Sequence, residues 1–166
     1  MLSKRLLPLL LSIALSACGF HLRGAVVIPD ALKETHIVGI AEYAPLALEL
    51  KRVLTNAGAK VLPAKAKAAS TIVISKNAYT RRVLSVDAQG RAAEYALVYS
   101  VSFQVNDAAG KPIVANQTID LNRDFRFDPN AVLAKDTEEQ QIRADMIRMA
   151  VHQMMRRIDA TLKQKG

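Results

Sequence analysis

Residues 92–106 read Ala-Ala-Glu-Tyr-Ala-Leu-Val-Tyr-Ser-Val-Ser-Phe-Gln-Val-Asn, and this stretch decides the fold. Large apolar side chains occupy every second position of its main part, at Tyr95, Leu97, Tyr99, Val101, Phe103 and Val105. Polar side chains alternate with them in the second half, at Ser100, Ser102, Gln104 and Asn106. Because successive side chains of a strand point to opposite faces of a sheet, this period of two predicts a β-strand with one buried and one polar face.

Turn sequences flank this strand on both sides. Asp-Ala-Gln-Gly at residues 87–90 precedes it, and Asp-Ala-Ala-Gly-Lys-Pro at residues 107–112 follows it. Both are typical of hairpin loops. Alternating segments continue beyond each turn, at residues 71–86 and 113–127. We therefore predict three long antiparallel strands whose apolar face is covered and whose other face is polar.

The remaining segments predict one further strand and two helices. Residues 35–41 form a short apolar run suited to a buried strand. Pro45 opens a helix that continues to residue 56, and a second helix with a broad apolar face runs from residue 131 to about 162. The predicted fold is α+β: a two-layer sandwich in which two helices pack on one face of a mostly antiparallel, four-stranded sheet.

The N-terminus has the features of a lipoprotein export signal. Lys4 and Arg5 precede an apolar run at residues 6–15, and the small residues Ser16 and Ala17 lead to Cys18. The run is too short for a lasting membrane span. An ordinary secretory signal with a stray cysteine, or a short anchor, would be the alternatives. We predict that the thiol of Cys18 is the site of lipid attachment.

This interpretation divides the chain into three parts. Residues 1–17 are a cleaved signal peptide, residues 18–30 a lipidated leader, and residues 31–166 a single α/β domain. Gly19, where Asp would favour retention at the inner membrane, predicts the periplasmic side of the outer membrane. Cys18 is the only cysteine, so no disulfide within the chain can stabilise the domain.

Net charge is strongly positive, at +8 for the whole chain and +6 once Lys4 and Arg5 leave with the signal. A basic domain often binds nucleic acid, but an exported lipoprotein does not meet a genome. Lipopolysaccharide (LPS) is the anionic partner available at an outer membrane, and plain solubility is the alternative explanation of the charge. The candidate LPS-binding residues are Arg81, Arg82, Arg91 and Lys135, although adjacent Arg81 and Arg82 should point to opposite sheet faces.

Nothing in the sequence has the pattern of a catalytic or cofactor site. The three histidines, His21, His36 and His152, are scattered and form no metal-ligand spacing. No nucleophile elbow, phosphate loop or dinucleotide-binding turn is present. We therefore expect a protein that is not an enzyme and uses neither a cofactor nor a metal.

Three motifs resemble one family, the LPS-assembly lipoprotein LptE (rare lipoprotein B) family. The first is Cys18-Gly19-Phe20-His21-Leu22-Arg23-Gly24, directly after the signal. The others are Gly90-Arg91-Ala92-Ala93-Glu94-Tyr95, at the start of the central strand, and Val132-Leu133-Ala134-Lys135-Asp136-Thr137-Glu138-Glu139, at the start of the last helix. The order of elements also matches, so the resemblance covers the whole mature chain.

The resemblance implies a function and a partner. A member of this family would form a heterodimer with the outer-membrane β-barrel LptD, plug its lumen and assist its assembly. The pair would be the translocon that delivers LPS to the outer leaflet. Lys135 matches the family's lysine in Leu-Ala-Lys-Asp, whereas Arg91 is offset within its turn relative to the family's basic residue.

A second function stays open at this point. The chain could be a stand-alone lipoprotein, facing the periplasm, that binds or carries a lipid or an envelope polymer. A carrier should enclose an apolar pocket. A plug should instead have a solid core and a surface that fits its partner.

Overall fold

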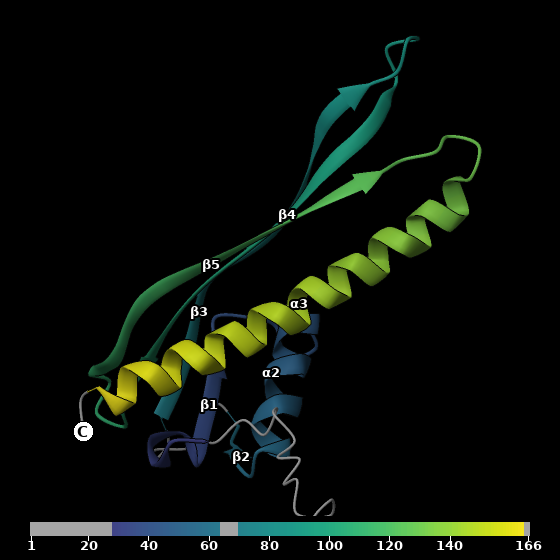
Figure 1. Cartoon of the computed structure of the whole chain (residues 1–166). Coiled ribbons are helices and arrows are strands. Elements are labelled where there is room, and N and C mark those ends of the chain that lie inside the picture. Colours follow the sequence, from purple (N-terminus) through teal and green to yellow (C-terminus); the bar gives the residue numbers. More distant parts are fainter. Residues whose placement is uncertain (1–27, 64–69, 165–166) are drawn as a thin grey trace, which may run out of the picture.

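Three long strands form the centre of the sheet in the computed structural model, which describes residues 28–63 and 70–164 (Figure 1). They are β3 (Ser70–Val86), β4 (Ala92–Asn106) and β5 (Pro112–Arg126), and each pairs antiparallel with the next. In both hairpin loops an Asp carboxylate, from Asp87 or Asp107, accepts two backbone N–H bonds from the loop itself. The predicted α+β class and the two hairpins are confirmed.

Within the described residues the sheet has five strands rather than the predicted four, in the order β2-β1-β3-β4-β5. β1 (Glu34–Val38) pairs in parallel with β3 on one side and with β2 (Lys60–Val61) on the other. Two residues are too few to show any alternation, which is why β2 could not be predicted. β1 also ends earlier than expected, because Gly39 has a φ of +83° and a Cβ there would collide with the carbonyl oxygen of Ile74.

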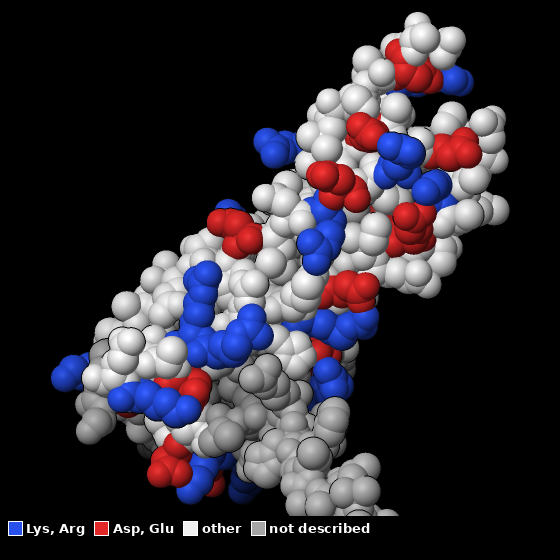
Figure 2. All heavy atoms as spheres, in the orientation of Figure 1, with Lys and Arg blue, Asp and Glu red and all other residues white. Residues whose placement is uncertain are grey.

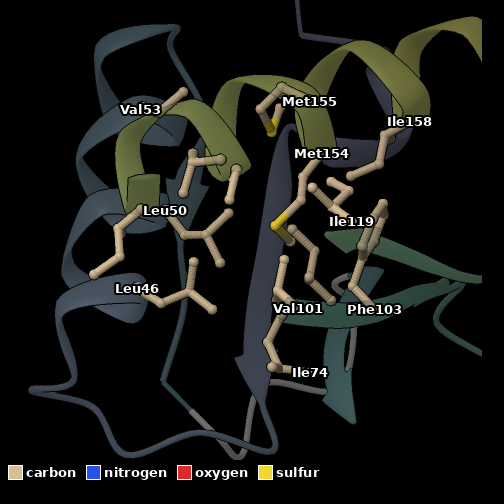
Figure 3. Close-up of a cluster of buried hydrophobic side chains, with 14 of the residues drawn as sticks. Leu46, Leu50, Val53, Ile74, Val101, Phe103, Ile119, Met154, Met155 and Ile158 are labelled. Carbon is tan, nitrogen blue, oxygen red and sulfur yellow. The ribbon is translucent and has the colours of Figure 1, made fainter. Parts of the chain in front are cut away.

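Both helices cover the same face of the sheet, as predicted. They are α2 (Pro45–Asn56) and α3 (Val132–Lys163), and a short 3-10 helix, η1 (Asp30–Leu32), precedes β1. Figure 3 shows Leu50 of α2 and Met154 of α3 among side chains that point toward Val101 and Phe103 of β4. The side chains of all four residues are buried to 3% exposure or less, so the space between the layers is filled.

α3 is packed along only part of its length. Its buried residues begin at Met146 and include Met146, Ile147, Ala150, Val151, Met154, Met155 and Ile158. The first part, residues 132–145, has no fully buried side chain and lies over the narrower half of the sheet, beyond the reach of α2, β1 and β2 (Figure 1). We call residues 77–95 and 121–143 the distal end of the molecule, and the part around α2, β1 and β2 the proximal end.

The predicted export signal at residues 1–17, Cys18 and the predicted leader up to residue 27 lie outside the described residues. Among residues 28–63 and 70–164, no helix combines the length and the apolar character needed to cross a membrane.

Candidate functional site

Glu139 of α3 is the centre of a polar cluster at the distal end. Its carboxylate accepts a hydrogen bond from the Tyr79 hydroxyl at 2.8 Å and forms an ion pair with Arg81 at 2.8 Å. Both partners lie on β3 with one residue between them, so they share one face of the strand. Burial, together with the bond to Glu139, raises the pKa of the Tyr79 hydroxyl above its usual range. The cluster ties the otherwise unpacked start of α3 to the sheet.

Cations lie over the aromatic rings of this face. The guanidinium of Arg81 is 4.2 Å from the ring centre of Tyr95, and that of Arg143 is 4.8 Å from the ring centre of Tyr79. Cation–ring contacts of this kind each contribute about 0.5–1 kcal/mol where they are exposed. Polar and cation–ring contacts therefore supplement the burial of Phe125 and the partly buried Ile142 in holding the helix at the distal end.

Lys135 and Arg81 lie over two aromatic rings that are neighbours in the sheet. Its ammonium group is 5.6 Å from the ring centre of Phe125, and Phe125 is the direct cross-strand partner of Tyr95, over which Arg81 lies. Lys135 also forms an ion pair with Glu138 at 2.7 Å. Two of the four candidate cations are thus brought together on the helix-covered face.

The other two candidates lie elsewhere. Arg91 is at the tip of the β3–β4 hairpin, where it forms a 2.8 Å ion pair with Asp87. Backbone and side-chain hydrogen bonds from Arg91 hold the pKa of the Asp87 carboxyl below its usual range. Arg82 directly follows Arg81 in β3 and pairs with Ala96, without a bulge between the two. Its side chain therefore points to the face opposite that of Arg81, as the sequence predicts.

Exposed apolar side chains accompany these cations, and sequence reasoning missed them. Val83, Leu84 and Val86 of β3 are 52–59% exposed, and Val132 and Leu133 at the start of α3 are 46% and 84% exposed. A signal existed for both groups, because Val83-Leu84 breaks the alternation of the strand and Val132-Leu133 precedes the apolar stripe of the helix. Contiguous exposed apolar side chains mark interaction surfaces more often than isolated ones.

Charge at the distal end is balanced rather than basic. Figure 2 shows Lys and Arg side chains interspersed with Asp and Glu over this end. Most of the cations are paired, for instance Arg126, which lies 3.3 Å from Glu94. Exposed pairs of this kind contribute about 0–1 kcal/mol each, so a stronger anion can displace the carboxylate.

A second group of basic residues lies on the flank of α3 near its middle. Arg123 of β5, together with Arg148 and His152 of α3, borders a shallow groove of about 400 Å³. Ile142 and Met149 also line this groove, and Arg148 is paired with Asp145. The sequence did not predict this groove, because helix and strand meet here through residues far apart in the chain.

Among the described residues, no group of His, Cys, Asp and Glu side chains is arranged to hold a metal ion. What the distal end offers chemically is hydrogen-bond donation by cations beside exposed apolar side chains. That combination suits a ligand or partner with both anionic and apolar parts.

Comparison with known proteins gives one family. Residues 32–158 match the model of the family described as LptE, Lipopolysaccharide-assembly. The chain is 30% identical over 157 residues to the LPS-assembly lipoprotein LptE of Photorhabdus laumondii, covering 93% of this chain and 85% of that protein. The protein of the same name from Pectobacterium atrosepticum is 29% identical over 158 residues, with the same coverage.

Solved structures agree with this assignment. The solution structure of lipoprotein B from Nitrosomonas europaea is 31% identical, with a TM-score of 0.67 over 83% of this chain and 88% of that one. Rare lipoprotein B from Shewanella oneidensis, at 24% identity, has the same fold with a TM-score of 0.67 over 77% of this chain and 95% of that one. The chain therefore belongs to the LptE family of lipopolysaccharide-assembly lipoproteins, a family without enzymatic activity.

Proposed function

We propose that this protein is the lipoprotein subunit of an LPS translocon in the outer membrane. In this role it plugs the lumen of an LptD-type β-barrel, assists the assembly of that barrel and binds LPS during delivery to the outer leaflet. Membership of the LptE family supports the assignment. The filled space between sheet and helices favours a plug over a carrier, since a carrier needs an internal apolar pocket.

Anchoring follows from the N-terminal sequence. We propose that residues 1–17 are removed, that Cys18 carries the lipid, and that residues 18–30 connect the anchor to the domain at residues 31–166. Each buried methylene of an acyl chain contributes about 0.8 kcal/mol, so several chains hold the protein at the periplasmic side of the membrane. The anchor keeps the domain close to its barrel, which replaces a search in solution with a high local concentration.

LPS binding is best supported at the distal end. The observation that carries it is the meeting of cations and exposed apolar side chains, since LPS combines phosphates with acyl chains. Lys135 is the leading residue: it is beside Arg81, on the same side of the helix as the exposed Val132, and paired only through a surface contact with Glu138. Arg91 is similarly available at the hairpin tip.

Arg81 and Arg82 are less suited to direct contact with LPS phosphates, for different reasons. Arg81 holds α3 to the sheet through Glu139, so its release would cost local structure. Arg82 lies on the opposite face, away from Lys135. We therefore assign direct phosphate contact to Lys135 and Arg91, with Arg81 as a supporting charge.

Retention of LPS by the immobilised mature lipoprotein tests this site. The double variant Lys135→Glu, Arg91→Glu should retain at least about tenfold less LPS, because each charge-assisted bond contributes about 1.5–3 kcal/mol. Arg82→Glu makes the same charge change on the opposite face and should leave retention unaltered. Equal retention by the wild-type protein and the double variant would remove both residues from the site.

The barrel partner is tested separately, by isolating the tagged lipoprotein from outer membranes and identifying the protein that accompanies it. An LptD-type barrel in a one-to-one complex is the expected result. A well-expressed, acylated lipoprotein that never associates with a barrel would refute the plug role.

A further inference from the structure

One long edge of the sheet lacks a neighbouring strand. β1 covers β3 only from Ser70 to Val73, yet β3 continues to Val86. In the part of the chain that the structure describes, no strand pairs with the outer side of β3 beyond Val73. Uncovered strand edges present free N–H and C=O groups and readily recruit another strand.

Two hydrogen bonds at β5 establish which backbone groups face outward. The N–H of Phe127 donates to the carbonyl of Ala93, so odd-numbered residues at the end of β5 bond to β4. Arg157 reaches the carbonyl of Thr118 from outside the sheet at 2.8 Å, so even-numbered residues of β5 face away from β4. In an antiparallel pair these two orientations alternate along the strand.

The register carries this alternation across the sheet to β3. Leu121 bonds to its partner Tyr99, so the next residue of β4, Ser100, must bond to β3 through its partner Ala78. Between the irregularities near Ser75 and Leu84 the β3–β4 register is unbroken. The backbone groups that face outward from β3 are therefore those of Asn77, Tyr79, Arg81 and Val83.

The two sheet edges differ in whether side chains bond to their outward-facing backbone groups. On β5, the Arg157 guanidinium caps the carbonyl of Thr118, and Arg123 lies 3.4 Å from that of Asn122. On β3, no side chain among the described residues bonds to the four outward-facing backbone groups. This open edge also ends in three of the exposed apolar side chains, Val83, Leu84 and Val86.

Charge indicates what kind of strand the edge accepts. Residues 75–86 contain Lys76, Arg81 and Arg82 and no Asp or Glu, and within the described chain only Arg81 of these cations is paired, with Glu139 of α3. A second copy of the same edge would oppose cation to cation, which disfavours pairing of the protein with itself. An incoming segment that carries acidic side chains is complementary.

We propose that the outer edge of β3, from Asn77 to Val83, accepts an extended acidic segment of the barrel partner as an additional strand. This inference rests on the proposed function for the identity of the partner and adds the contact by which it is bound. Main-chain hydrogen bonds supply affinity in such strand addition, and side chains supply specificity. The apolar side chains at the end of β3 are covered by the same segment.

Hydrogen–deuterium exchange of the full acylated lipoprotein tests the proposal, measured free in detergent and in complex with its barrel. The amides of Asn77, Tyr79, Arg81 and Val83 should exchange quickly in the free protein and at least about fivefold more slowly in the complex. The outward amides of β5, such as those of Asp120 and Asn122, should change less. Protection of β5 alone, or of neither edge, would overturn the inference while leaving the plug role intact.

Proline substitutions provide the matched pair of variants. Val83→Pro removes an outward N–H on β3 without removing a bond to β4, and Asn122→Pro does the same on β5. Only Val83→Pro should lower the yield of co-purified barrel, by about fivefold for one lost bond. Circular dichroism verifies that both variants fold.

Three other outcomes count against the proposal. Equal loss of barrel in the two proline variants would overturn strand addition at β3. Concentration-dependent protection of β3 in the free lipoprotein would assign the edge to a second copy of the chain. Failure of the wild-type protein to associate with any barrel would overturn both the plug role and this contact.

Discussion

The proximal and distal ends of this molecule are built on the same three strands but are held together by different forces. At the proximal end, α2 and the last part of α3 bury leucine and methionine side chains against β4 (Figure 3). At the distal end, α3 meets the sheet through Glu139, Arg143 and Lys135. Burial of apolar area is the larger contribution to stability, so the proximal end maintains the fold and the distal end is free to bind.

The largest expected effect is at the proximal end. Phe103→Ala removes a fully buried ring and leaves a cavity, which should lower the free energy of unfolding by about 3–5 kcal/mol. Urea unfolding of the mature domain, followed by circular dichroism, measures it. Leu133→Ala is the distal control, and at 84% exposure it should change stability by no more than about 0.5 kcal/mol. Similar losses in both variants would contradict the division between the two ends.

The second-largest effect on stability is expected at alkaline pH, from Tyr99 where the two ends meet. Burial raises the pKa of the Tyr99 hydroxyl, which donates to Asn77, to about 12. The unfolded chain ionises near its ordinary pKa of about 10. The contribution of Tyr99 to stability is therefore full below pH 10, falls as the pH rises toward 12, and levels off above it.

Spectrophotometric titration of phenolate absorbance and unfolding at several pH values measure this behaviour. In Tyr99→Phe, the ionisation step near pH 12 should be missing while the late ionisation of Tyr79 remains, and stability should fall less between pH 10 and 12. An unchanged titration in that variant would mean that another tyrosine is responsible for the step near pH 12.

A smaller effect is expected where α3 is held by polar contacts. Glu139→Ala leaves Arg81 and Tyr79 without their shared acceptor and should cost about 1 kcal/mol. Amide exchange should become faster in residues 132–143 and stay unchanged from Met146 onward. Glu139→Gln keeps an acceptor for Tyr79, so its stability should lie between that of the wild-type protein and that of Glu139→Ala. Faster exchange along the whole helix would mean that the two parts of α3 are coupled.

The sequence predicted the elements whose apolar residues recur with a regular period. The strand at residues 92–106 and the helix at residues 45–56 have the bounds that alternation and the proline at a first turn indicated. The family could be identified from local motifs, and the comparisons agree with it. β2 was missed because its two residues carry no period.

The distal contacts could be predicted only in part. Opposite orientation of Arg81 and Arg82 follows from strand geometry and is confirmed. The link between Arg81 and Glu139 is not local, since 58 residues separate them and only the path of α3 over the sheet brings them together. The pairing of Lys135 with Glu138 lies within one helical turn, yet its position over Phe125 also depends on that path. Direct roles for Cys18 and the four candidate cations stay predictions.

The smallest expected effect on folding tests the distal surface itself. Leu84→Ser and Leu133→Ser replace side chains that are 52% and 84% exposed, so the unfolding free energy should change by no more than about 0.5 kcal/mol. The same double variant should be more soluble as a free domain, because it removes apolar area that only a ligand or partner would cover. Static light scattering over a concentration series measures solubility, and Leu48→Ser on α2 is a control of similar exposure at the other end. If both surfaces respond alike, exposed apolar side chains are not specific to the distal end; if only the distal variant responds, that end is the surface built for a partner.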